Sequence, residues 1–225
     1  MATNARDVGK VIATIPSRVG PTAGSALLRL VDLAIDGVYT LPGAKASAAK
    51  ALQRRGDAES AVDSLISSHV AMASAQGFAT NIGGVVTTIL TTPANITGVV
   101  VIQMRLVACI AHLRGYDIDD RRVRTAMLMC LLGDEELRRQ IESGRLPTSP
   151  MAVATAPVSD AALDLKVAER IVADVLTNIG GKRLSSIVGR KIPLIGGGVG
   201  AIYDGYGTHL IGQCAKAQLP TRRRS

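Results

Sequence analysis

The side chains of this sequence best suited to bind a metal ion are three histidines on separate segments, His69, His112 and His209. Histidines on facing helices, joined by a carboxylate such as Asp204 or Asp117, form metal sites inside helical bundles. Such sites usually contain two ligands three or four residues apart, whereas Asp204 lies five residues before His209. The spacing therefore favours ordinary histidines near helix ends, and we expect neither a metal site nor a cofactor.

No segment has the pattern of a catalytic site. The glycine run GGGVG at 196–200 lacks the GK[ST] ending of a phosphate-binding loop and follows Pro193 rather than a parallel strand. Cys109 and Cys130 lie in apolar stretches, where burial raises the pKa of a thiol and makes it a poor nucleophile. The carboxylates of DEELRRQ at 134–140 suit the first turn of a helix without a catalytic purpose. The sequence therefore predicts no catalytic residue.

Three polar residues, His112, Tyr116 and Asp204, would suit a ligand pocket inside a helical protein. Asp204 lies in a glycine-rich apolar segment, and a carboxylate buried there needs a partner. The candidate partners are Arg190, Lys191, Tyr203 and Tyr206. These residues support one hypothesis, a soluble helical enzyme or ligand carrier with a pocket between two helical hairpins.

The chain carries excess positive charge, with a net charge of +8 at pH 7. Many of these charges lie in two groups, Arg114, Arg121, Arg122 and Arg124 within the chain and Arg222, Arg223 and Arg224 near its end. Such groups usually remain solvated, but they also attract anionic surfaces such as lipid headgroups or nucleic acid. Arg121, Arg122 and the three tail arginines are therefore the candidate contacts with an anionic surface. Aromatic residues are only 2% of the chain, so we expect no specific nucleic-acid partner.

Helix signals run along most of the sequence. Apolar spacing predicts an amphipathic helix over 22–40, an alanine-rich helix that Gly56 ends, and a third helix that Asp57 caps. Further helix starts are predicted at Asp119 or Asp120, at Asp134, and at Ser159 or Asp160. The stretch 145–159 contains three prolines and indicates a loop or flexible linker.

The segment from Ser64 to Met104 contains no Lys, Arg, Asp or Glu. Two apolar helices joined near Pro93 are predicted here, as a hairpin that is either buried in protein or placed in a membrane. Gln103 and Arg105 lie near the middle of the second helix, where an arginine costs about 2.5–3.5 kcal/mol to insert into a bilayer. This cost favours a buried hairpin, and an interfacial or inserting role is the alternative.

The pentapeptide TNIGG occurs at 80–84 and again at 177–181, and each copy precedes a proline and a glycine-bearing apolar run. Small residues four positions apart on one helix face allow another backbone to approach closely, in a bilayer or in a tight bundle. The candidate packing or membrane-contact residues are Gly83, Gly84, Pro93, Gly196, Gly197, Gly200, Ala201 and Gly205. The predicted fold is all-α, a single helical bundle built around two glycine-rich apolar hairpins.

The length of 225 residues suits one domain, which we expect over 1–219, with a basic tail at 220–225. The three cysteines are far apart and form no C-x-x-C pair, so neither a disulfide framework nor a zinc knuckle is indicated. The start of the sequence lacks the apolar stretch of a secretory signal. We therefore expect a cytoplasmic protein, placed at the inner face of the membrane if it is peripheral.

Two segments resemble a known family, HLRGYDIDDRRVRTAMLMCLLG at 112–133 and IPLIGGGVGAIYDGYGTHLIGQCAKAQL at 192–219. Together with the apolar arm and the hairpin proline they are similar to the EcsC family over residues 60–219. The resemblance implies a mostly helical fold, and one member is encoded beside the subunits of an ABC exporter; no catalytic residues carry over. The chain departs from the family in its GYD and in Tyr203–Asp204, where an asparagine is frequent.

The resemblance and the apolar hairpins together predict a non-enzymatic protein at the cytoplasmic face of a membrane. Its expected partner is a membrane lipid, an apolar ligand or a membrane protein, bound through the two hairpins.

Overall fold

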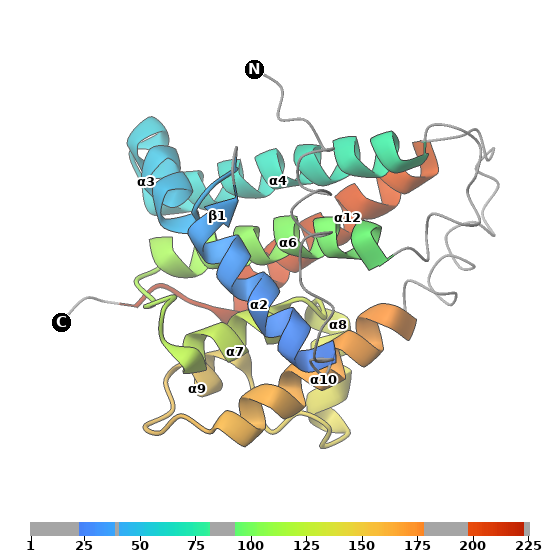
Figure 1. Ribbon diagram of the computed structural model, residues 1–225. Coiled ribbons are helices and arrows are strands. Elements are labelled where there is room, and N and C mark those ends of the chain that lie inside the picture. Colours follow the sequence, from blue (N-terminus) through green and yellow to red (C-terminus); the bar gives the residue numbers. More distant parts are fainter. Residues whose placement is uncertain (1–22, 39–40, 82–92, 178–197, 223–225) are drawn as a thin grey trace.

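The computed structural model describes residues 23–38, 41–81, 93–177 and 198–222, and helices make up most of these ranges (Figure 1). The helices are α2 (Ala23–Asp36), α3 (Ala44–Arg55), α4 (Ala58–Asn81), α6 (Pro93–Leu113), α7 (Arg121–Cys130), α8 (Asp134–Glu142), α9 (Pro150–Ala154), α10 (Ala161–Thr177) and α12 (Gly198–Gln218). Two short strands, β1 (Gly37–Val38) and β2 (Leu41–Pro42), pair antiparallel between α2 and α3. The prediction of an all-α fold is confirmed.

Side-chain caps start several helices where the sequence predicted them. Asp57 Oδ1 accepts a hydrogen bond from Ser60 N at 2.8 Å before α4, and Asp120 accepts one from Arg122 N at the start of α7. Asp160 Oδ1 accepts from the second and third residues of α10. Gly56, at φ 84°, ends α3 in the left-handed region that favours glycine.

Two predicted boundaries differ from the structure. The first helix ends at Asp36 rather than continuing to 40, because Gly37 has φ 89° and enters the strand pair. Asp134 is the first residue of α8 rather than its cap, since Gly133 precedes it with φ 74°. The carboxylate of Asp134 instead pairs with Arg138 one turn later.

The stretch 145–159, expected to be a loop or flexible linker, contains the short helix α9. Ser149 caps this helix by accepting a hydrogen bond from Ala152 N. Leu146, Val153 and Ala154 are buried, and α9 packs on α7. Apolar contacts with α7 therefore order a segment that its prolines had indicated as irregular.

The three long helices α4, α6 and α12 lie side by side (Figure 1). Arg105 of α6 lies level with His69 of α4, and the Arg114 side chain near the end of α6 reaches Glu59 at the start of α4, so these helices are antiparallel. Lys216 of α12 pairs with Asp63 of α4, so α12 is also antiparallel to α4. Helices α6 and α12 are therefore parallel.

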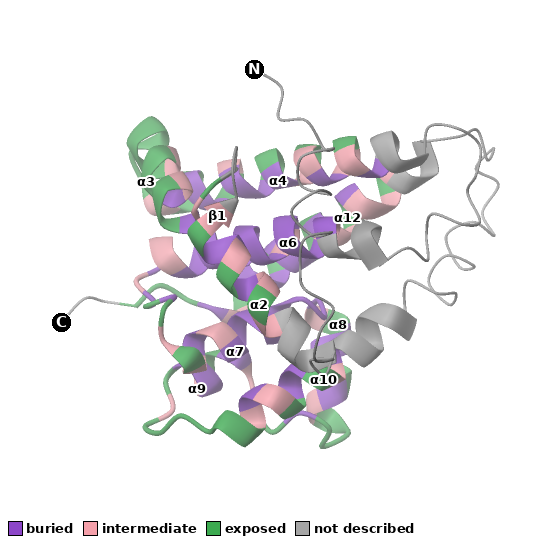
Figure 2. Cartoon of the chain, in the orientation of Figure 1, coloured by how far each residue is buried: buried purple, intermediate pink, exposed green. Residues whose placement is uncertain are grey.

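Helix α6 forms the centre of the core (Figure 2). All its residues from Met104 to Ala111 are buried, as are those of α7 from Thr125 to Cys130. Helix α10 packs on α2 and α7, whereas α12 packs on α4 and α6. The turns of the two expected hairpins, with Gly83, Gly84, Gly196 and Gly197, lie outside the described residues.

Glycines of α12 allow it to pack closely on α4, the most extensive helix pairing among the described elements. A Cβ atom at Gly205 would lie 2.2 Å from Ser74 Oγ, and one at Gly212 would lie 2.9 Å from Ile66 Cγ1 and 3.2 Å from Leu106 Cδ2. All three distances are shorter than ordinary van der Waals contacts. A side chain at either position must displace a neighbour.

We expect Gly212→Val to lower the free energy of unfolding by about 2–3 kcal/mol, because Ile66 and Leu106 are packed in the core and have little room to move. Gly205→Ala is the control, since the Ser74 hydroxyl can rotate away and the expected loss is under about 1 kcal/mol. Urea unfolding followed by circular dichroism measures both values. Equal losses would contradict the packing described at Gly212.

Candidate functional site

The three residues of the predicted pocket do not form one site. His112 lies in the last turn of α6, and Tyr116 Oη donates a hydrogen bond to the carbonyl oxygen of Pro220 at 3.0 Å. Asp204 lies on α12, about sixteen residues before Pro220, and this separation corresponds to about 24 Å along a helix. Asp204 is therefore near one end of the three-helix layer, and the other two residues are near the opposite end.

Asp204 lies on the inward side of α12, one turn before Thr208, whose hydroxyl oxygen accepts a hydrogen bond from Gln103 Nε2 of α6. Burial raises the pKa of the Asp204 carboxyl from 3.8 to about 7, because it disfavours the charged form. Within the described ranges this carboxylate has neither a hydrogen bond nor an ion pair. Its expected partners Arg190 and Lys191 lie outside those ranges, and Tyr206 is exposed.

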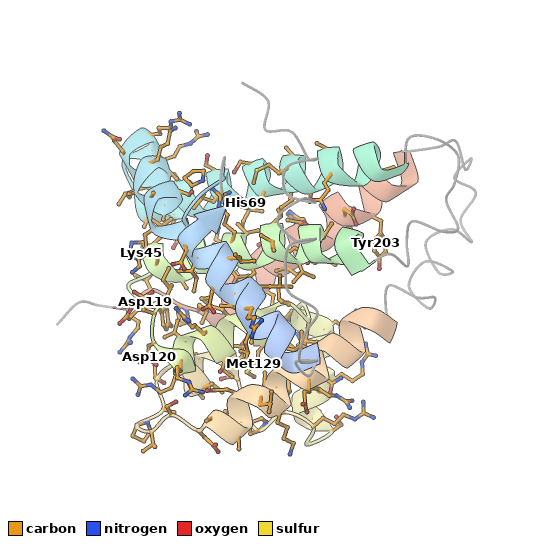
Figure 3. The ribbon with its side chains drawn as sticks, viewed as in Figure 1. Lys45, His69, Asp119, Asp120, Met129 and Tyr203 are labelled. Atoms are coloured by element: carbon orange, nitrogen blue, oxygen red, sulfur yellow. The ribbon has the colours of Figure 1, made fainter. Side chains whose placement is uncertain are left out.

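A buried polar cluster lies where α3, α4 and α6 meet, around His69 (Figure 3). Arg105, only 6% exposed, donates from Nε to Pro42 O at 2.9 Å, and from Nη2 to Ser47 Oγ at 2.6 Å. Its Nη1 lies 3.4 Å from His69 Nε2, and His69 Nδ1 lies 2.8 Å from the Leu65 carbonyl oxygen. The ring therefore donates from Nδ1 and accepts at Nε2.

The chemistry of this cluster is structural. Burial lowers the pKa of His69 to about 4, so the ring is neutral at pH 7 and both of its nitrogens are engaged. Burial likewise raises the pKa of the nearby Cys109 thiol to about 12. A general base needs a free lone pair near neutral pH and a nucleophile needs a lowered pKa. The cluster supplies neither, and it fixes β2 and α3 to α6.

The remaining histidines do not complete a metal site either. His209 is exposed on α12, and His112 is partly exposed at the end of α6. Among the residues with described positions, no group of three His, Cys, Asp or Glu side chains could hold a metal ion.

Arg121 and Arg122, two of the arginines expected to attract an anionic surface, form ion pairs within the protein. Arg121 pairs with Asp164 at 3.2 Å, and Arg122 with Asp120, which also caps α7. Figure 3 shows Asp120 beside the Lys45–Asp119 pair, in which Nζ and Oδ2 are 2.5 Å apart. The remaining pairs of this group are Arg124 with Asp32 and Arg114 with Glu59. These cations connect α2, α4, α7 and α10 within the fold.

The beginning of the basic tail is attached to the body of the protein. Arg222 N donates to the carbonyl oxygen of Arg114 at 2.9 Å, and the Arg222 guanidinium lies 5.5 Å from the centroid of the Tyr116 ring. This distance suits a cation–π contact. Arg223 and Arg224 lie outside the described residues.

Cations without a described ion-pair partner gather instead on α3, a helix with four basic and no acidic residues. Lys50, Arg54 and Arg55 are exposed, and within the described ranges none pairs with a carboxylate. The sequence contains this signal, because AKASAAKALQRR has no Asp or Glu. We call these three residues the α3 cations.

An apolar surface lies on the outward side of α12. Ile202, Tyr206 and Leu210 are 57%, 55% and 40% exposed and stand four residues apart, so they follow one another along the helix. The residues exposed beside them on α12 include His209 and Gln213, and none of the exposed residues from 202 to 213 is Asp, Glu, Lys or Arg. We call Ile202, Tyr206 and Leu210 the α12 stripe. The spacing of four residues is visible in the sequence, but the exposure of this side of the helix is not, because burial depends on packing against other helices.

Pro93 is the first residue of α6, and Gly200 lies in the first turn of α12. Ala201 follows Gly200 in α12 and is partly exposed. None of the helices in the described ranges combines the length and the apolar character needed to cross a bilayer.

No curated protein and no solved structure matches the chain. The model of the EcsC protein family matches residues 5–223. This match extends the resemblance seen at 60–219 toward the start of the chain, where it includes the sequences of α2 and α3. Because it spans nearly all of the 225 residues, the chain belongs to the EcsC protein family.

Proposed function

We propose that this protein is a non-enzymatic accessory factor that binds the lipid surface of a membrane peripherally, through the α12 stripe. The observation that carries the proposal is the exposure of Ile202, Tyr206 and Leu210 on one helix face. Apolar side chains aligned on a surface helix enter the boundary between headgroups and acyl chains, and tyrosine favours that boundary.

The outer surface of α4 supports the same role. Its exposed residues after Asp63 include Ser67, Ala71 and Ala75, all uncharged, and this helix packs directly on α12. Charged groups that would have to be desolvated on contact with lipid are therefore few on these two outer faces.

The energy available from the stripe indicates weak and reversible binding. Fully burying one large apolar side chain contributes about 1.5–3 kcal/mol, and the three residues are about half exposed, so together they contribute about 3 kcal/mol. This is less than a single acyl anchor supplies. The protein should therefore exchange between membrane and solution.

The arginines form ion pairs within the protein, so the proposed membrane contact should depend little on salt concentration. Arg121, Arg122 and Arg124 each have a carboxylate partner, so their net attraction for an anionic surface is small. Salt screens charge interactions over about 10 Å at 0.1 M but does not weaken apolar burial.

The proposed factor is non-enzymatic because the described polar groups do not suit acid–base or nucleophilic catalysis. His69 is neutral with both nitrogens engaged, the Cys109 thiol has a raised pKa, and Asp204 lies far from His112. These groups provide no pair of acid and base within reach of one another.

Flotation with liposomes tests the proposal. Only a fraction of the full chain should float with neutral phosphatidylcholine liposomes, even at high lipid concentration, and Ile202→Ser/Leu210→Ser should lower its partition coefficient roughly 30-fold, because about 2 kcal/mol of apolar burial is lost. The matched control is Met151→Ser/Val158→Ser, which alters two residues that are 44% and 76% exposed away from α12. This control should float like the unaltered protein.

Two outcomes would overturn the proposal. Equal flotation of both double variants would show that the α12 stripe is not the contact. Binding that requires anionic lipid, and that disappears at high salt or in Lys50→Gln/Arg54→Gln/Arg55→Gln, would assign the attraction to the α3 cations instead.

A further inference from the structure

Helix α3 presents positive charge that no carboxylate in the described ranges neutralises. Lys50 and Arg54 are exposed and stand four residues apart, so they are neighbours on one face of the helix, and Arg55 follows at its end. Like charges at this spacing destabilise a helix. None of the three cations has an ion-pair partner among the described residues. A carboxylate supplied by another molecule would therefore remove a repulsion that the fold leaves uncompensated.

We propose that the α3 cations form a docking surface for an acidic helix of a partner protein, which carries carboxylates four residues apart. Two carboxylates at this spacing lie on one helix face, about 6 Å apart along the axis, as Lys50 and Arg54 do. The opposite charges would therefore match when the two helices lie side by side. The inference goes beyond the proposed membrane contact and does not depend on it.

The face of α3 beside these cations suits the close approach of a helix. Ala46 and Ala49 are exposed next to Lys50, and Gln53 continues the same face without a formal charge. Small side chains let another backbone come near, and a shorter distance strengthens each charge pair. Leu52, which is 39% exposed, adds an apolar contact at the edge of this face.

Neighbouring carboxylates favour a narrow partner over a broad anionic surface. Asp57 is exposed two residues after Arg55, and the exposed Asp119 pairs with Lys45, the remaining cation of α3. An anionic bilayer or a nucleic-acid duplex that reached the α3 cations would also approach these carboxylates and be repelled by them. Recognition of anionic lipid also usually needs about four to eight clustered basic residues, more than α3 presents.

The α3 cations and the α12 stripe are separate surfaces. Helix α3 ends just before Ala58, the first residue of α4, whereas Gly205 of α12 lies against Ser74. Ala58 and Ser74 are about sixteen residues apart, which corresponds to about 24 Å along α4. This separation exceeds the distance of about 10 Å over which charges interact at 0.1 M salt. The two contacts can therefore be measured independently.

The test measures binding of the full chain to two labelled, alanine-based helical peptides by fluorescence anisotropy at low salt. Both peptides contain the same number of glutamates, spaced four residues apart in one and two residues apart in the other. The first should bind several-fold more tightly, because its carboxylates share one helix face. Lys50→Gln/Arg54→Gln/Arg55→Gln should weaken its binding roughly 10-fold, since three exposed charge pairs are lost.

The matched control is Arg29→Gln/Arg145→Gln/Lys166→Gln, which removes the same charges from exposed residues that lie outside α3. It should change the affinity less than about twofold, because its residues do not form part of the docking surface. The α3 triple variant should unfold at the same urea concentration as the unaltered protein or at a higher one, since a repulsion is removed.

Four results would overturn the proposal. Equal affinity for the two peptides, or equal weakening by the two triple variants, would show only general attraction by a basic protein. Lower stability of the α3 triple variant would show that these cations serve the fold. Tighter binding of an anionic liposome or an oligonucleotide that the α3 triple variant loses would assign the surface to lipid or nucleic acid. Failure of flotation with neutral liposomes would leave the peptide result unchanged, because no lipid is present.

Discussion

Arg114→Met is expected to lower the free energy of unfolding by about 2–4 kcal/mol. The Arg114 side chain is 6% exposed, and its Nη1 donates to the carbonyl oxygens of Lys216 and Leu219 at the end of α12. Its Nη2 lies 2.9 Å from both carboxylate oxygens of Glu59 in α4. The variant leaves the two carbonyls without this donor and separates the ends of three helices. Urea unfolding measures the loss.

Arg138→Met is the matched control for this change. Arg138 is an exposed arginine that pairs with Asp134 within α8, and such surface pairs contribute about 0.5 kcal/mol or less. Limited proteolysis gives a second measurement, since residues 220–222 are held by Arg114 and Tyr116. If Arg114→Met cost no more than Arg138→Met, then Arg114 would not be the residue that holds these helix ends together.

Asp204→Asn is expected to stabilise the protein at pH 8 by about 2–4 kcal/mol and to have little effect near pH 4. The folded-state pKa of Asp204 is about 7, above its ordinary value of 3.8, because burial disfavours the charged form. The folded protein therefore binds a proton more tightly than the unfolded chain, and this contribution is lost as pH rises from about 4 through 7. Asparagine keeps the size and removes the charge.

The measurement is the difference in unfolding free energy between the variant and the unaltered protein at several pH values. The comparison is necessary because His69 acts in the opposite direction. Its pKa is lowered from 6.5 to about 4, so its contribution is present above pH 6.5 and is lost as pH falls through 4. Both proteins contain His69, and its contribution cancels in the difference. A difference independent of pH would show that Asp204 ionises as in water.

The arginine ion pairs and the α12 stripe have different roles in the protein. The ion pairs connect helices, whereas the stripe exposes apolar side chains. Arg124 connects α7 to α2 through Asp32, and Arg121 connects α7 to α10 through Asp164. The outward side of α12 carries exposed apolar residues. If flotation supports the proposal, apolar burial rather than charge attraction is the source of binding.

Local signals in the sequence determined where many of the helices start and stop. Asp57, Asp120 and Asp160 accept hydrogen bonds from backbone N–H groups within three residues, and Gly56 tolerates a positive φ. These effects act within one helical turn and depend little on the rest of the fold. The all-α class and the family resemblance were predictable for the same reason, since helical spacing and motifs are contiguous in the chain.

Tertiary structure decided which residues meet and which sides of the helices are exposed. Arg114 pairs with Glu59 across a long stretch of chain. The predicted set of His112, Tyr116 and Asp204 failed to come together because α12 runs parallel to α6 and places Asp204 at the far end. The periodicity of a sequence identifies the faces of a helix but not which face is buried, because burial depends on neighbours distant in sequence. Packing of α12 against α4 and α6 buries Thr208 and leaves Tyr206 exposed.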